Sequence, residues 1–186
     1  MNVEARLRRA LNSREPVRVR RNIRGADVLD GYVQAVGAKW MLLAVLRDVT
    51  LDGFVALRLK DIAKAERCYA PKFWRRALEL RGEWPPAAPM NEITLDEITL
   101  DGIRGLLESA GEALVAVYIE REDPGVCFIG VPVKVTRRRL HLTEVTAKAK
   151  WRTDGSRWDL KSITRVDFGD RYMRALTAVA GPRPRN

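Results

Sequence analysis

The sequence is poor in the residues that build disulfide frameworks, metal sites and membrane helices. Among 186 residues there are two cysteines, Cys68 and Cys127, and one histidine, His141, which argues for a reducing compartment and against a zinc site. The longest apolar run, from Trp40 to Leu46, is far shorter than the roughly 20 residues of a membrane helix. The arginines near the N-terminus are not followed by an apolar stretch, so no secretory signal is expected. We therefore expect a cytoplasmic protein without a membrane segment, a metal or a cofactor.

The sequence also lacks the motifs of common enzyme classes. It has no Walker-type phosphate loop, no Gly-x-Gly-x-x-Gly and no Gly-x-Ser-x-Gly. His141 falls in an alternating strand pattern beside Arg139, without an identifiable nucleophile or carboxylate partner. Cys68 and Cys127 lie in apolar strand contexts and are expected to be buried, unreactive thiols. We therefore expect that the protein is not an enzyme.

A weak internal repeat organises the chain, with an offset of 96 to 102 residues between its two copies. Matching phrases include an Asp-Gly pair, a Leu-Lys-x-Ile phrase and an aromatic residue followed by Arg-Ala-Leu, and they occur in the same order in both halves. The matched segments are 7–11 and 103–107, 17–19 and 115–117, 31–33 and 130–132, 52–53 and 154–155, 59–62 and 160–163, 74–78 and 172–176, and 82 and 181. This order predicts two units, 1–82 and 100–186, joined by a Pro-rich and acidic linker at 83–99.

Each copy has the periodicity of a helix, five short strands and a second helix. Apolar residues at helical spacing begin the copies, Val3 to Leu11 in the first and Ile103 to Leu107 in the second. Alternating or apolar runs then predict strands, and the Asp-Gly pairs 52–53 and 154–155 are interpreted as hairpin turns. The strands are expected at about 17–21, 28–36, 39–48 and two within 55–65, with counterparts at 114–120, 126–135, 138–147 and two within 158–168. The final helices are expected from Pro71 to near Gly82 and at about 170–179.

Five strands in about 55 residues with tight turns favour a small, strongly bent barrel. The expected fold is therefore mainly β with flanking helices (α+β), built from two repeated five-stranded antiparallel small barrels. Within the linker region, residues 93–97 are echoed almost verbatim by 98–102. That echo fits either a strand or a leader into the next helix.

A helix followed by five bent antiparallel strands resembles the Sm-like fold, an SH3-like small barrel. The apolar spacing of the first Sm motif is matched by Gly31, Val33, Val36, Met41 and Leu43. Ala38 and Lys39 stand where that family has an acidic and an amide residue, and residues 59–61 and 160–162 replace its apolar-Arg-Gly motif. The resemblance thus implies the fold and assembly through edge strands into rings or oligomers, without the uridine pocket.

The formal net charge of +10 is unevenly distributed along the chain. Residues 1–82 carry 18 Lys and Arg against 9 Asp and Glu, residues 83–125 carry 2 against 10, and residues 126–186 carry 14 against 5. Two basic blocks thus flank an acidic one. Clustered cations beside a tryptophan are typical of a surface that follows a phosphate backbone and stacks a base. The candidate nucleic-acid-binding residues are Arg18, Arg20, Arg21, Arg24, Arg137, Arg138, Arg139, Lys148, Lys150, Trp151 and Arg152.

Two interpretations of these charges remain open. In the preferred interpretation, the protein is noncatalytic and binds nucleic acid, RNA above all, through Arg-rich strand surfaces. Trp158 is a second candidate for stacking on a base, although it also suits the barrel interior. In the alternative, the chain is a protein–protein interaction or assembly module, and its acidic residues pack across the basic surface of the same chain or a neighbour. A small-molecule sensor using the barrel mouth has no polar constellation in its favour. The acidic residues concerned are Glu92, Asp96, Glu97, Asp101, Glu108 and Glu112.

Overall fold

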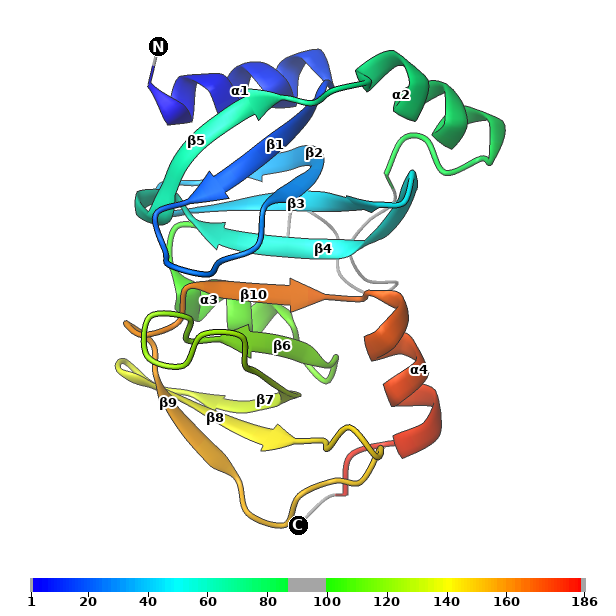
Figure 1. Cartoon of the computed structure of the whole chain (residues 1–186). Helices are drawn as coiled ribbons and strands as arrows, with labels where there is room; N and C mark the ends of the chain where they lie inside the picture. Colours follow the sequence, from blue (N-terminus) through cyan, green and yellow to red (C-terminus); the bar gives the residue numbers. More distant parts are fainter. Residues whose placement is uncertain (1, 87–99, 185–186) are drawn as a thin grey trace.

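The computed structural model describes residues 2–86 and 100–184 (Figure 1). The first half contains α1 (Val3–Ser13), β1 (Pro16–Arg21), β2 (Leu29–Val36), β3 (Trp40–Arg47), β4 (Thr50–Arg58), the 3₁₀-helix η1 (Leu59–Asp61), β5 (Ile62–Arg67) and α2 (Pro71–Leu80). The second half contains α3 (Ile103–Ser109), β6 (Val115–Tyr118), β7 (Cys127–Val135), β8 (Arg139–Glu144), β9 (Ser156–Asp159), β10 (Arg165–Phe168) and α4 (Arg171–Ala180). The predicted order of helix, five strands and helix is confirmed in both halves, as is the mainly β fold with flanking helices. Most of the echo at 93–102 lies outside the described residues.

All ten strands belong to one antiparallel sheet with the order β5-β1-β2-β3-β4-β10-β6-β7-β8-β9. The order of the first five strands recurs in the second half, with β10 in the place of β5. The halves join where residues 54–57 of β4 pair with residues 165–168 of β10. Because β4 uses its outer edge for β10, it does not close on β5. The sheet is therefore open, with β5 and β9 at its edges, and the expected two closed barrels are replaced by one continuous sheet.

Each half has a glycine and a β-bulge at equivalent positions of its second strand. A side chain at Gly31 would place its Cβ 2.2 Å from the carbonyl oxygen of Ala44, and one at Gly130 would lie 2.2 Å from that of Thr143. Each glycine is thus required where the second strand of its half crosses closely over the third. Two residues further along, each second strand has a β-bulge, between Val33 and Ala35 and between Pro132 and Lys134. These paired features support the repeat inferred from the sequence.

The interpretation of the Asp-Gly pairs as hairpin turns is wrong for the first pair. The chain reverses between β3 and β4 at Asp48 and Val49, whose φ angles of 47° and 64° suit the two central positions of a tight hairpin turn. Asp52 and Gly53 lie within β4. The second pair, residues 154–155, lies in the connection that leads into β9.

The hydrophobic core changes from one face of the sheet to the other between the two halves. In β3, Met41 and Leu43 face a cluster that is covered by α1, whereas Leu42 and Ala44 face a cluster shared with α3 and the second half. Strand β3 is consequently buried on both faces. A third cluster lies under α4, which covers the other face of β6 and β7. The second half is thus packed on the outer face of the first.

Charged side chains complete the contact between the halves. Arg21 of β1 forms a buried ion pair with Glu120, which follows β6. Asp61 of η1 accepts hydrogen bonds from Arg58 Nε at 2.5 Å and from Arg121 Nη2 at 2.8 Å. Desolvation opposes ionisation of Asp61, but these two guanidinium groups outweigh it and hold the pKa of its carboxyl below the usual range. Of these ion pairs, Arg21–Glu120 joins the basic block 1–82 to the acidic block 83–125 with the expected signs, whereas Asp61–Arg121 joins them with the signs reversed.

Candidate nucleic-acid interface

The candidate residues in the first half are mostly engaged within the chain. Arg18 Nε and Nη2 donate to the two carboxylate oxygens of Asp30 at 2.8 and 2.7 Å. Arg20 pairs with Glu66 at 3.2 Å. Arg21 is 8% exposed, and its buried pairing with Glu120 removes it from any ligand-facing surface. Of the four arginines, Arg24 alone is exposed without an ion pair among the described residues.

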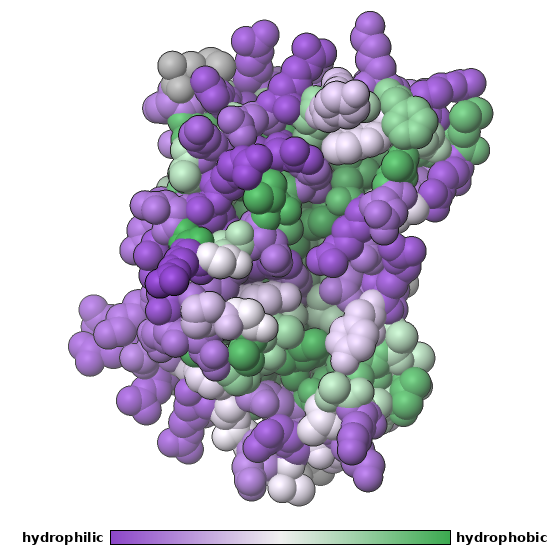
Figure 2. Space-filling view, viewed as in Figure 1, coloured by the Kyte–Doolittle hydropathy of each residue, from purple (hydrophilic) through white to green (hydrophobic). Residues whose placement is uncertain are grey.

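Candidate residues in the second half lie at the surface. Arg137 and Arg138 occupy the turn between β7 and β8, where the Thr136 side chain accepts a hydrogen bond from the backbone N–H of Arg139 at 2.9 Å. Their side chains are exposed and form no ion pair within the described residues. Arg139 has a long contact of 3.6 Å with Asp159, and both side chains remain about half exposed. Figure 2 shows hydrophilic side chains projecting on the side where this turn lies in Figure 1.

The connection after β8 positions the remaining candidates. Lys148, Lys150 and Arg152 are exposed. Trp151 is half-buried: it packs in the cluster under α4, and its Nε1 donates to the carbonyl oxygen of Gly181 at 3.3 Å. Trp158 faces the core, with its ring 4.0 Å from that of Phe128 between centroids. Both indoles thus have protein partners, and neither ring stands free as a stacking platform.

A row of cationic or titratable side chains crosses β7, β8 and β9, and sequence analysis identified it only in part. Lys134 is paired in the sheet with His141, and His141 with Arg157. Residues opposite each other in neighbouring strands project to the same face. Lys134 and Arg157 are exposed, His141 is partly exposed, and none of the three side chains has a hydrogen bond or ion pair among the described residues. Together with Arg137, Arg138 and Arg139, this row forms what we term the basic sheet face.

The β-bulge in β7 determines which residues belong to this row. Val131 pairs with Thr143 and Pro132 with Leu142, so an unbroken ladder would place Val133 opposite His141 and turn Lys134 toward the core. The bulge inserts Val133 as an extra residue and brings Lys134 opposite His141. Alternation in the sequence alone does not locate a bulge. The bulge at the equivalent position of β2 indicates a bulge in β7, but only when the structure of the first half is available.

Equivalent positions in the two halves differ sharply in chemistry. The row Ala35–Leu42–Ala56 in the first half has the same pairing as Lys134–His141–Arg157 in the second. In the first half the row continues into Val166 of β10 and is covered by the second half. In the second half the row ends at the free edge of β9. The fold therefore uses this face for packing in one half and leaves it charged in the other.

The described acidic residues do not pair with the basic sheet face, apart from Asp159. Asp101 accepts a hydrogen bond from the backbone N–H of Ala38 at 3.2 Å, Glu108 pairs with Arg104 of the same helix at 2.7 Å, and Glu112 pairs with Arg183 at 3.1 Å. The other three acidic candidates, Glu92, Asp96 and Glu97, lie outside the described residues.

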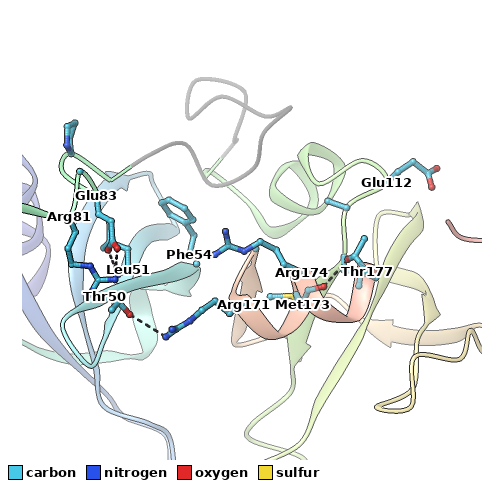
Figure 3. A pocket seen from close by; sticks show the side chains of 16 residues that line it. Thr50, Leu51, Phe54, Arg81, Glu83, Glu112, Arg171, Met173, Arg174 and Thr177 are labelled. Atoms are coloured by element: carbon cyan, nitrogen blue, oxygen red, sulfur yellow. Dashed lines mark hydrogen bonds and ion pairs between the residues drawn. The ribbon is translucent and has the colours of Figure 1, made fainter. Parts of the chain in front are cut away.

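A cleft of about 780 Å³ lies between the start of β4, the segment after α2 and the first turns of α4 (Figure 3). Its walls combine apolar side chains, including Leu51 and Phe54, with arginines. Arg81 pairs with Glu83 at 2.6 Å, and Arg171 with Asp52 at 3.3 Å. The side chain of Arg174 points toward Phe54 (Figure 3). The charges of this cleft are largely satisfied within the chain, so it is a weaker candidate for an anion than the basic sheet face.

The described residues contain no group of three or more His, Cys, Asp and Glu side chains placed to hold a metal ion. Burial raises the pKa of the Cys68 thiol to about 12, and burial likewise raises that of Cys127. Thiols with a raised pKa are poor nucleophiles at neutral pH. None of the helices in the described ranges is long and apolar enough to cross a membrane.

Comparison of the chain with protein-family models, with curated proteins and with solved structures found no match.

Proposed function

We propose that this is a noncatalytic nucleic-acid-binding protein whose basic sheet face contacts the phosphate backbone. The observation that carries the proposal is the row Lys134–His141–Arg157, at positions where the first half has alanine and leucine. Lys134 and Arg157 are exposed and His141 is partly exposed, and none of the three side chains has a hydrogen bond or ion pair within the described residues. Cations without internal partners lose little on binding phosphate and release the counterions condensed on it. RNA is the expected class because of the resemblance to Sm-like proteins. The repeated strand order, Gly31 and Gly130, and the two bulges support our view that the two halves are divergent copies of one five-stranded unit.

The chemistry of this face favours backbone contact over base recognition. Its side chains are Lys, Arg and His, and the neighbouring indoles of Trp151 and Trp158 are occupied by other contacts. Binding through phosphate alone positions a strand without reading its sequence. We therefore expect similar affinities for oligonucleotides of different sequence and a strong dependence on salt.

The test is fluorescence anisotropy with labelled single-stranded RNA and DNA of mixed sequence and a matched duplex, between about 50 and 200 mM salt. The variant Lys134→Ser/Arg157→Ser is expected to bind at least fivefold more weakly and to lower the slope of log K against log salt by about 1 to 2. The matched control is Lys60→Ser/Lys64→Ser, which removes the same charge near the opposite edge of the sheet, from exposed side chains that have no ion pair in the described part of the chain. Equal losses in both double variants, or affinity that does not change with salt, would exclude the basic sheet face as the binding site.

The same comparison of the halves bears on assembly through edge strands. At the internal junction, the outer face is apolar: it is formed by Leu42 and Ala44 of β3 and by Ala56 of β4. At the free edge, the equivalent residues are His141, Thr143 and Arg157. Charged residues on an edge strand oppose pairing with another sheet.

We therefore expect a monomer, because a second copy would find no apolar face at β9 on which to pack. Light scattering coupled to size exclusion should give a mass near 21.1 kDa at all loading concentrations. A stable ring or filament of several chains would show that the charged edge is compatible with the junction seen inside the chain.

A further inference from the structure

An exposed apolar stripe runs along α2, on the side of the helix away from the core. Phe73 and Leu80 are 61% and 70% exposed, and Tyr69, just before the helix, is 94% exposed. Positions 73, 77 and 80 recur at the spacing that places side chains on one helical face. We term Tyr69, Phe73, Ala77 and Leu80 the α2 stripe. Figure 2 shows hydrophobic side chains at the surface where α2 lies in Figure 1.

The fold does not require these apolar residues. Leu78 of α2 and Leu176 of α4 are buried at equivalent positions of the repeat. With the same offset, Phe73 and Leu80 correspond to Arg171 and Ala178. A charged and a small residue therefore serve at these positions in the second half. Exposed apolar side chains that gather in a patch, rather than lying singly, are typical of a contact surface.

Cations flank the stripe. Lys72 is exposed without a hydrogen bond or ion pair among the described residues. Arg75 and Arg76 share a single carboxylate, that of Glu79, at 3.0 and 3.7 Å. Arg81 follows the helix and pairs with Glu83. The helix thus presents an apolar line with excess positive charge beside it.

We propose that the α2 stripe docks an acidic amphipathic helix of a partner protein. Apolar side chains at helical spacing on the partner would cover Phe73 and Leu80, and its carboxylates would meet Lys72 and Arg76. An amphipathic helix binds a protein through its apolar face, and complementary charge around such a contact guides association and adds specificity. Self-association is disfavoured, because two copies of α2 face to face would bring their cations together. This surface is separate from the basic sheet face, so the two proposals stand or fall independently.

The test uses a labelled synthetic peptide of about 18 residues with leucines at helical spacing and glutamate at the other positions. Two further peptides serve as probes of the mechanism: one with the same composition in scrambled order, and one with lysine in place of glutamate. We expect the acidic amphipathic peptide to bind the full chain at least about tenfold more tightly than either, measured by anisotropy.

Variants locate the site. Phe73→Ser/Leu80→Ser should weaken binding about tenfold or more, whereas Tyr172→Ser/Val179→Ser, which removes two exposed apolar side chains from α4, should leave it unchanged. Lys134→Ser/Arg157→Ser should also leave it unchanged, which separates this surface from the nucleic-acid face. Unchanged binding to Phe73→Ser/Leu80→Ser, or equal binding of the scrambled peptide, would overturn the proposal. A dimer of the wild-type chain that disappears in Phe73→Ser/Leu80→Ser would assign the stripe to a second copy and overturn it as well.

Discussion

Replacing Glu120 by leucine is expected to lower the free energy of unfolding by about 3 to 5 kcal/mol. The Arg21 side chain that Glu120 neutralises is fully buried, and Glu120 is nearly so. Arg21 Nη2 donates to Glu120 at 2.6 Å, and the Thr164 hydroxyl donates to the same carboxylate at 2.7 Å. A guanidinium cannot escape by losing its proton, so without Glu120 its charge stays buried and uncompensated. Arg21 Nε has no hydrogen-bond partner among the residues described, so the compensation of this guanidinium depends on its hydrogen bonds to Glu120.

A double-mutant cycle separates this cost from ordinary loss of packing. The variant Arg21→Met/Glu120→Leu replaces the ion pair with apolar side chains and should recover most of the stability lost in Glu120→Leu, since such replacements are often neutral or stabilising. Urea unfolding followed by circular dichroism measures the wild type, the single variants Arg21→Met and Glu120→Leu, and the double variant. Equal destabilisation of the single and double variants would mean that shape, rather than buried charge, governs this position. A second transition in Glu120→Leu would show that the ion pair couples the two halves.

Most of the secondary structure could be predicted because helices and strands each impose a characteristic spacing of apolar residues in the local sequence. The predicted helix that starts at Pro71 and the strand at 28–36 agree with α2 and β2 to within about two residues. The repeat could also be detected, because close approach of two strands requires glycine at position 31 and at position 130, and this requirement preserves one of the matches between the two halves. The pairing of β4 with β10 could not be predicted from the sequence. It joins residues more than 100 positions apart through backbone hydrogen bonds, which depend little on the identity of the side chains.

The candidate site was harder to predict because charge in a sequence does not reveal its partner. Arg18 and Arg137 look alike in their basic clusters, yet Arg18 donates hydrogen bonds to Asp30, while Arg137 has no ion pair with any residue that the structure describes. Arg21 meets a carboxylate 99 positions away. Lys134 joins the basic sheet face through a bulge that alternation does not encode. The prediction therefore included Arg137, Arg138 and Arg139 but omitted Lys134 and Arg157, which the structure places on the same candidate face.

Gly53→Ala is expected to destabilise the protein by more than the roughly 1 to 3 kcal/mol that a strained backbone conformation alone costs. Gly53 has a φ of +73°, which side chains other than that of glycine adopt with strain. Its Cβ would also lie 2.5 Å from the carbonyl oxygen of Phe168 and 2.7 Å from the backbone nitrogen of Asp170. These atoms are backbone at the end of β10 and the start of α4, so neither can rotate away. Relief would require separating β4 from β10 at the junction of the two halves.

The matched control is Gly25→Ala, at a φ of +74° with no atom within 4 Å of the added Cβ. Since the two glycines have nearly the same positive φ, the difference between the losses of unfolding free energy in the two variants reports mainly on the contact with β10 and α4. Hydrogen exchange of the β10 amides adds a local measurement, because opening of the junction exposes them while leaving β1 and β2 protected. Equal destabilisation in both variants, with unchanged exchange in β10, would mean that the junction tolerates a methyl group there. A larger loss in Gly53→Ala, with faster exchange confined to β10 and its neighbours, would show that the pairing of β4 with β10 requires the absence of a side chain at position 53.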